Sequence, residues 1–160
     1  MRIGQGRDLH RLEEGRRLIL GGIEIPFTKG CVAHSDGDVL VHAVIDAIFG
    51  AAALGDIGSH FPDTDPAYRG ADSMDLLAKA VRLLNAEGYR LVNVDSTVTL
   101  EKPKLRAFIE PIRISLARVL RIEPGSVSVK AKTNEGLDAA GRGEAVEAQA
   151  VVLIKKHRNR

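Results

Sequence analysis

The chain lacks tryptophan and has one cysteine, four phenylalanines and two tyrosines among its 160 residues. Cys31 cannot form an internal disulfide, and it has no second cysteine with which to build a zinc knuckle or a redox pair. We therefore expect a reducing compartment. So few aromatic side chains also leave little material for stacking nucleic-acid bases. These absences argue against disulfide scaffolds, cysteine-based zinc modules and single-strand nucleic-acid binders.

A strong charge of one sign is also missing, because 23 lysines and arginines stand against 21 aspartates and glutamates. A formal net charge of +2 gives no electrostatic reason to expect nucleic acid. The basic excess gathers in KKHRNR, from about residue 155, which we interpret as a solvated tail. The most apolar run, residues 39–55, is interrupted by His42 and Asp46, and the first residues lack a signal-peptide core. The sequence predicts a cytoplasmic protein that binds no membrane.

What is present is an ordinary globular composition, 44% hydrophobic and 28% charged. A chain of this length is the size of one domain and buries roughly two thirds of its unfolded surface. No internal repeat, low-complexity segment or interdomain linker divides it. We expect a single domain over residues 1–160, in which the loop of residues 60–73 is the one long connection.

Apolar spacing predicts three helices. The first spans residues 35–55, with Ser35 as N-cap and Asp38 three residues later in an arrangement that resembles a capping box. The second spans residues 73–88, between a serine cap and a glycine stop. The third, over residues 105–120, contains a proline that should mark a kink or the first regular turn.

Alternating apolar and polar residues predict the strands. The clearest alternation runs from Val92 to Leu100. Further strands are expected near residues 2–10, 18–25, 127–131 and 146–154. This order of strands and helices indicates an α+β fold, with one mixed sheet backed by about three helices.

Asp8 and His10 are two residues apart on a predicted strand, so both side chains point to the same face. His42, in the second turn of the first helix, is the best third partner. Two histidines and a carboxylate suit zinc, and three protein ligands leave a position open for a substrate oxygen or water. The pattern is weak by itself, because a helical histidine is often only a hydrogen-bonded core residue. Asp38 or Asp46 on the same helix face could orient the ring, although capping and solvent contact are commoner roles for such carboxylates.

Three other motifs are compatible with phosphate, sugar or metal binding. His34 and Ser35 stand before a helix N-terminus, which favours phosphate, although Ser35 could be only a cap. The stretch GDIGSHFPDTDP could bind sugar hydroxyls or merely turn the chain. Glu135, shortly after Lys132 and Thr133, could hold Mg²⁺ that bridges phosphates, or could belong to an exposed turn. Neither a P-loop nor a dinucleotide fingerprint is present.

The motifs also occur together and in a fixed order: RIGQGRDLH, AHSDGDVLVHAVIDAIFGAAALGDIG, FPDTDP, GADS, NVDSTV, KPKL, VSVKAKTNE and GRGE. In this combination the sequence resembles the 2-C-methyl-D-erythritol 2,4-cyclodiphosphate synthases over roughly residues 1–155. The resemblance implies a phosphorus–oxygen lyase of non-mevalonate isoprenoid biosynthesis. Its substrate would be 4-diphosphocytidyl-2-C-methyl-D-erythritol 2-phosphate, whose 2-phosphate attacks the β-phosphorus, expels CMP and closes the cyclic diphosphate.

The resemblance implies two metal sites. Asp8, His10 and His42 would hold Zn²⁺, which polarises the β-phosphate. Glu135 would bind Mg²⁺ or Mn²⁺ between the α- and β-phosphates. The nucleophile is already a phosphate anion, so no side chain must deprotonate it, and catalysis reduces to neutralising charge and positioning two phosphates.

The resemblance also implies the residues that contact substrate. His34 and Thr133 would stabilise the charge that develops in the transition state. The erythritol and phosphate groups would contact Asp8, His10, His34, Ser35, Asp56, Ile57, Gly58, Phe61, Pro62, Asp63, Thr64 and Asp65. The cytidine diphosphate would contact Leu100, Pro103, Lys104, Leu105, Arg106, Ala131, Lys132, Thr133, Asn134 and Glu135, and the remaining contacts would be Ala139 and Arg142.

Members of this family are homotrimers with active sites between subunits, the zinc side on one chain and the nucleotide side on its neighbour. Many also hold an isoprenoid diphosphate in an apolar central cavity. Here Arg142 is kept, but Ala139 replaces an aromatic residue and Asp138 stands where glycine is common, which argues against that cavity ligand.

Two other functions remain compatible with the residues. A zinc phosphohydrolase would use water in the open metal position, would need a base nearby and would release a linear product. A non-enzymatic module would be either a sensor of isoprenoid diphosphates or a structural zinc protein. A structural zinc site would normally be closed by a fourth ligand, and no cysteine pair is available for that.

Overall fold

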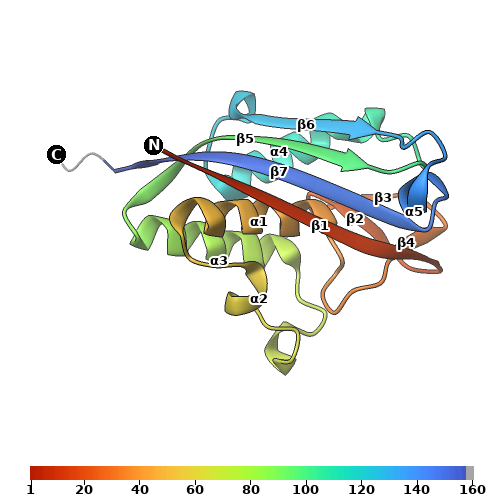
Figure 1. Ribbon diagram of the computed structural model, residues 1–160, viewed down its shortest axis with the longest axis horizontal. Helices are drawn as coiled ribbons and strands as arrows, with labels where there is room; N and C mark the ends of the chain where they lie inside the picture. Colours follow the sequence, from red (N-terminus) through yellow and green to blue (C-terminus); the bar gives the residue numbers. More distant parts are fainter. Residues whose placement is uncertain (158–160) are drawn as a thin grey trace.

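The computed structural model describes residues 1–157 and contains one mixed five-stranded sheet in the order β4-β1-β7-β5-β6, beside a two-stranded hairpin, β2-β3 (Figure 1). The strands are β1 (Arg2–Glu14), β2 (Leu18–Leu20), β3 (Ile23–Ile25), β4 (Lys29–Cys31), β5 (Tyr89–Thr99), β6 (Val127–Lys132) and β7 (Ala145–Lys156). The helices are α1 (Val39–Ala52), α2 (Ile57–His60), α3 (Ser73–Ala86), α4 (Ile109–Leu120) and α5 (Asp138–Gly141). Single 3₁₀ turns cover Pro66–Tyr68, Arg106–Phe108 and Pro124–Ser126.

The predicted α+β fold with a mixed sheet is confirmed. Strands β1 and β5 both pair antiparallel with the central β7, whereas β6 pairs parallel with β5. The three predicted helices correspond to α1, α3 and α4, which lie on one face of the sheet and enclose the core (Figure 1). The short helices α2 and α5 were not predicted, because four residues are too few to show a helical period. No helix within residues 1–157 has the length and apolar character needed to cross a membrane.

The predicted starts of the first two helices were wrong. Helix α1 begins at Val39, four residues after Ser35, because the buried Asp38 carboxylate caps it by accepting the Val41 N–H at 3.0 Å. The same carboxylate accepts the N–H groups of Gly21 and Gly22 at 3.0 and 2.7 Å, which ties the β2-β3 turn to the helix. Burial raises the pKa of Asp38 to about 6, although these hydrogen bonds oppose the shift.

For helix α3 the N-cap was predicted one residue too late, at Ser73 instead of Asp72. Asp72 accepts the Met74 N–H at 2.8 Å, and Ser73 is the first helical residue rather than the cap. The interpretation of Pro111 is confirmed, since α4 starts at Ile109 and places the proline in its first turn. Lys155 and Lys156, which we assigned to a solvated tail, belong to β7, and residues 158–160 lie outside the described residues.

Two glycines on β1 allow α1 to lie directly on that strand. Every second residue of β1 points to the face that meets α1, and these residues include Gly4, Gly6, Asp8 and His10. A Cβ atom added at Gly6 would lie 2.0 Å from the Ala43 carbonyl oxygen, which no real contact permits. The close approach brings the next two side chains of that face, Asp8 and His10, to the first turns of α1. The glycines thus position the candidate site.

We expect Gly6→Ala to lower the free energy of unfolding by about 1–3 kcal/mol, because the added methyl group overpacks the β1–α1 contact. Chemical denaturation monitored by circular dichroism measures the change. Gly125→Ala is the matched control, since a Cβ atom there meets nothing within 4 Å and should alter stability by less than about 0.5 kcal/mol. Equal stability of the two variants would contradict the close-approach argument.

Candidate active site

Most of the predicted site residues line one of two pockets, and the two pockets share no residue. One row of paired residues crosses the sheet from Asp8 on β1 through Ala148 and Val98 to Ala131 on β6. Three strand spacings of about 4.8 Å put roughly 14 Å between the two ends of this row. Ala148 and Val98 are fully buried, so packed core separates the pockets. A single chain does not bring the two groups together.

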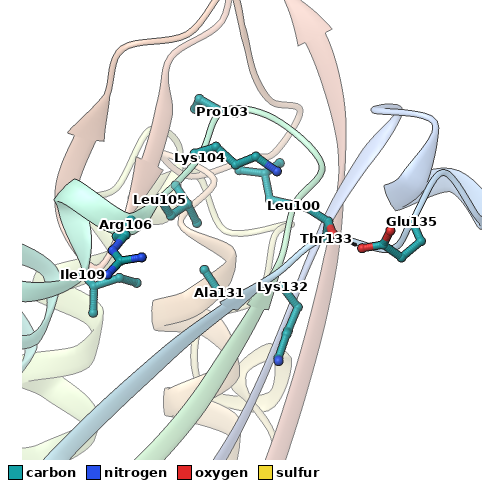
Figure 2. A pocket seen from close by; sticks show the side chains of 10 residues that line it. All are labelled: Leu100, Pro103, Lys104, Leu105, Arg106, Ile109, Ala131, Lys132, Thr133 and Glu135. Atoms are coloured by element: carbon teal, nitrogen blue, oxygen red, sulfur yellow. Dashed lines mark hydrogen bonds between the residues drawn. The ribbon is translucent and has the colours of Figure 1, made fainter.

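The first, which we call the β6 pocket, lies where the 100–106 loop, the end of β6 and the start of α4 meet (Figure 2). It encloses about 500 Å³. Nearly all residues predicted for the nucleotide end lie together in its lining, and Ile109 is added to them. The lining consists of Leu100, Pro103, Lys104, Leu105, Arg106, Ile109, Ala131, Lys132, Thr133 and Glu135. Asn134 does not line it, because its amide nitrogen donates to the Asp138 carboxylate at 2.7 Å.

The β6 pocket has three cationic side chains and one acidic side chain in its lining, and all four residues are exposed. Lys104, Arg106 and Lys132 line it, and none of the three forms an ion pair among residues 1–157. Thr133 Oγ1 donates to Glu135 Oε1 at 2.7 Å, so these two side chains form one polar unit (Figure 2). Glu135 has φ 52°, a backbone conformation that residues with a side chain rarely adopt. The cationic lining of the pocket fits an anionic ligand.

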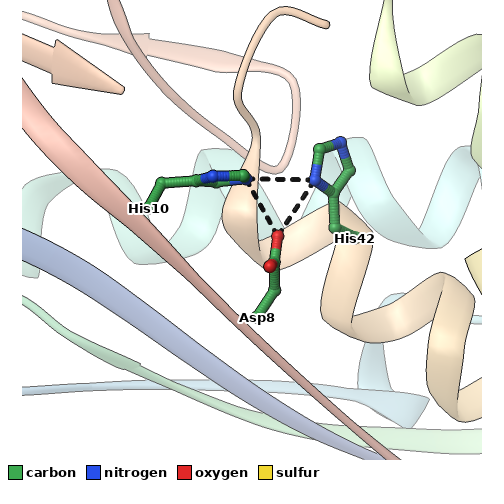
Figure 3. A group of neighbouring side chains, drawn as sticks. All are labelled: Asp8, His10 and His42. Atoms are coloured by element: carbon green, nitrogen blue, oxygen red, sulfur yellow. Dashed lines mark hydrogen bonds and ion pairs between the residues drawn. The ribbon is translucent and has the colours of Figure 1, made fainter. Parts of the chain in front are cut away.

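The second, which we call the triad pocket, contains Asp8, His10 and His42 (Figure 3). His10 Nε2 lies 2.9 Å from Asp8 Oδ2, His42 Nδ1 lies 3.0 Å from the same oxygen, and the two nitrogens are 3.2 Å apart. A tetrahedral zinc ion with bonds of about 2.0–2.1 Å separates two ligand atoms by about 3.3 Å. The three atoms would therefore need to shift by only a few tenths of an ångström. The donor set and its spacing fit zinc.

The electrostatics of the triad also favour a cation. Burial would raise the pKa of Asp8, but hydrogen bonds and charge from His10 and His42 outweigh it and hold that pKa well below its usual range. Burial would lower the pKa of His42, yet the Asp8 carboxylate outweighs it and raises that pKa. Asp8 is thus ionised, and its negative charge stabilises positive charge beside it, either a proton on His42 or a metal ion.

The rest of the triad pocket comes from the loop before α1 and from α2. Its lining is completed by Val32, Ala33, His34, Ser35, Ile57, Gly58, Phe61, Asp63, Tyr68 and Leu76. His34 Nε2 is buried and has no hydrogen-bond partner among the described residues, as expected of a group that awaits a ligand. Because Asp38 caps α1 and the helix starts at Val39, His34 and Ser35 lie earlier in the preceding loop and not directly at the helix N-terminus, which corrects the sequence interpretation. The sequence analysis did not predict four further lining residues, Val32, Ala33, Tyr68 and Leu76. No sequence motif distinguishes the side chains that line a pocket in this way from other core residues.

Neither carboxylate on the α1 face orients His42. Asp38 caps the helix, and Asp46 accepts the Ile57 N–H at 2.7 Å, which fixes the start of α2. The capping role that we weighed is confirmed for Asp38, whereas Asp46 holds the backbone at the start of α2 and is neither a cap nor exposed. The far nitrogen of His42 instead meets two serine hydroxyls, those of Ser73 at 2.9 Å and Ser35 at 3.2 Å.

Several predicted contacts do not line either pocket in this chain. Asp56 caps α2 by accepting the Ser59 N–H at 2.9 Å, and Asp65 accepts the Ala67 N–H at 2.9 Å in the same way. Pro62 and Thr64 lie in the same loop without lining the pocket. Ala139 lines a third cavity, and Arg142 pairs with Glu144 at 3.1 Å.

Comparison with known proteins assigns the chain to a family. A model of the YgbB family matches residues 1–155. The 2-C-methyl-D-erythritol 2,4-cyclodiphosphate synthase of Chloroherpeton thalassium is 56% identical over 156 residues, which cover 98% of this chain and 99% of that protein.

Solved structures agree. The bifunctional IspDF from Campylobacter jejuni superposes with a TM-score of 0.94 at 41% identity, covering 98% of this chain and 42% of that longer one. A CDP-bound 2C-methyl-D-erythritol-2,4-cyclodiphosphate synthase superposes with a TM-score of 0.90 at 46% identity, covering 96% of this chain and all of that one.

The fold and these relatives therefore place the chain among enzymes of the lyase class. The chain belongs to the YgbB family, that of the 2-C-methyl-D-erythritol 2,4-cyclodiphosphate synthases of isoprenoid biosynthesis, as the sequence motifs predicted.

Proposed function

We propose that this chain converts 4-diphosphocytidyl-2-C-methyl-D-erythritol 2-phosphate to 2-C-methyl-D-erythritol 2,4-cyclodiphosphate and CMP in the non-mevalonate pathway, in the cytoplasm. The observation that carries the proposal is the complementarity of the two pockets. One offers a zinc-compatible triad, and the other offers cationic side chains beside an acidic group. A substrate with a nucleoside diphosphate at one end and a second phosphate at the other requires both.

The triad pocket would receive the phosphates that react. Asp8, His10 and His42 would hold zinc, which supplies Lewis-acid polarisation of a phosphoryl oxygen when bound. His34, with its unpartnered buried nitrogen, would hydrogen-bond an oxygen on which negative charge develops. Asp63 and Gly58 at the pocket wall would orient the erythritol hydroxyls.

The β6 pocket would hold the cytidine diphosphate. Lys104, Arg106 and Lys132 would neutralise diphosphate charge, and the buried Leu100 and Leu105 would contact the base or ribose. Glu135 would carry Mg²⁺ or Mn²⁺ against the diphosphate, since these ions need few protein ligands. Thr133, which donates to Glu135, would turn its hydroxyl toward the departing phosphate.

Cyclisation needs no general base in the chain. The attacking group is a phosphate oxygen that is already ionised, so the barrier is charge repulsion and misorientation. Holding the 2-phosphate in line with the β-phosphorus converts the reaction to a positioned intramolecular displacement. The residues of both pockets supply cations and hydrogen-bond donors, which is the chemistry that this displacement requires.

We propose that the active site lies between subunits of a homotrimer, with the triad pocket of one chain facing the β6 pocket of its neighbour. The buried core between the pockets supports this arrangement, because packed side chains separate the two pockets within one chain. The sheet face opposite the helices also exposes Ile3, Leu9 and Val151, which are 71%, 48% and 38% exposed and would be covered by other subunits. Ala139 lines the third cavity, whose apolar wall of Leu9, Leu12, Ala139 and Ala145 contains no aromatic side chain, and this small wall argues against an isoprenoid diphosphate there.

Phosphorus NMR of the zinc- and magnesium-loaded protein with the proposed substrate tests this function. We expect a pair of coupled cyclic diphosphate signals together with CMP, and their loss after treatment with a chelator. A linear phosphorylated product would identify a hydrolase instead. Zinc binding without any turnover would favour a non-enzymatic module.

A further inference from the structure

The side of His42 that faces away from the triad enters a short hydrogen-bonded chain. His42 Nε2 lies 2.9 Å from the hydroxyl oxygen of Ser73, the first residue of α3. The Ser73 hydroxyl donates in turn to Asp36 Oδ1. Asp36 is fixed by two further bonds, because it also accepts the N–H groups of Ser73 at 3.0 Å and Asp38 at 3.2 Å. Ser73 has no exposed surface, so water cannot substitute for its hydroxyl.

The direction of these hydrogen bonds follows from counting protons. The Asp36 carboxylate can only accept, so the single hydroxyl proton of Ser73 is committed to it. The Ser73 oxygen is then left as an acceptor for His42 Nε2–H. With its proton on Nε2, a neutral His42 ring has its free electron pair on Nδ1, the nitrogen that faces Asp8 and His10.

Ser35 does not perform the same task. Its hydroxyl oxygen is farther from Nε2, at 3.2 Å, and it also accepts the Gly37 N–H at 3.3 Å. No carboxylate takes its proton among the described residues, so that proton is available to a ligand in the triad pocket. Ser35 therefore suits substrate contact, whereas the proton of Ser73 is already used.

We propose that Ser73, held by Asp36, is a positioning residue that fixes the ring orientation and tautomer of His42 for metal binding. The inference rests on the proposed zinc site. A helix-capping role does not explain the Ser73 hydroxyl, because Asp72 caps α3. Residues that orient a metal-bound histidine through its second nitrogen typically contribute about 10- to 100-fold to metal affinity.

Zinc affinity, measured by competition with a chromophoric chelator, tests the proposal. We expect Ser73→Ala to bind zinc about 10- to 100-fold more weakly than the unaltered chain, and excess zinc to restore most of its kcat. Ser96→Ala is the matched control, since Ser96 is buried on β5, donates to the Ser128 carbonyl at 2.9 Å and lies outside both pockets. Thermal unfolding without zinc should change alike in the two variants.

A second measurement uses the unaltered, zinc-loaded chain and needs no variant to fold. Nitrogen-15 NMR should show a His42 Nε2–H that exchanges slowly with solvent, because a buried hydroxyl accepts it. Equal zinc affinity of Ser73→Ala and Ser96→Ala, or a rapidly exchanging Nε2–H, would overturn the positioning role while leaving the zinc site intact. Failure of the unaltered chain to bind zinc would overturn both that site and this inference.

Discussion

His42→Ala is expected to lower kcat/KM for CMP release by at least about 10³-fold, because losing one of three ligands removes a metal that contributes several kcal/mol to the transition state. The fold should remain, since eleven other residues of α1 are buried and unaffected. CMP release followed by chromatography measures the activity, and circular dichroism checks the fold. Zinc content should fall in parallel.

His157→Ala provides the matched control, because this histidine follows β7 and its backbone N–H binds the Gly88 carbonyl at 2.8 Å, outside both pockets. Its activity and zinc content should equal those of the unaltered chain. If His42→Ala kept normal turnover, His42 would not be a zinc ligand in the reaction.

Glu135→Gln is expected to lower kcat/KM by about 10²–10³-fold, the effect of removing one group that stabilises developing charge. The amide keeps the shape of the side chain but loses the charge that would hold Mg²⁺ or Mn²⁺. Titrating Mg²⁺ at fixed substrate should show that the variant requires a higher concentration or does not respond. Stability should be unchanged, because Glu135 is exposed.

Glu87→Gln is the companion variant for this comparison, since it alters an exposed glutamate at the end of α3, outside both pockets. It should show the unaltered magnesium response. A Glu135→Gln variant with the same response as Glu87→Gln would remove Glu135 from the second metal site.

Local geometry made the triad a candidate, and the resemblance to a known family then implied that it holds zinc. Asp8 and His10 share a strand face by the two-residue period, and His42 occupies the inner face of a helix that starts shortly before it. The residues alone could not show that this helix lies on β1 in the required register. The contact of Gly6 with Ala43 sets that register, and it is visible only when both elements are placed.

Helix starts were the weakest part of the sequence prediction. Ser35, Asp36 and Asp38 are all good N-caps by residue type, and local preference cannot choose among them. The choice is made by tertiary contacts, because Asp38 also binds the distant turn at Gly21 and Gly22. The same error concealed the role of Ser73, which was assigned to capping while its hydroxyl lies against His42.

The separation of the site residues into two pockets could not be predicted from any single sequence motif. Their separation depends on the strand order, in which β7 and β5 stand between β1 and β6. Strands distant in sequence become neighbours, and this order follows from the packing of the whole sheet rather than from any segment. The motifs alone therefore indicate the residue types of the site but not the distance between them.

Mixing the two inactive variants tests the central claim, an active site shared between neighbouring chains, most directly. His42→Ala and Glu135→Gln chains, co-expressed in equal amounts, would form trimers in which some sites combine an intact triad with an intact Glu135. Random assembly predicts about one quarter of the unaltered activity, because each of two halves is intact with even odds. Activity no greater than the sum of the separate variants would contradict the shared site and place both halves within one chain.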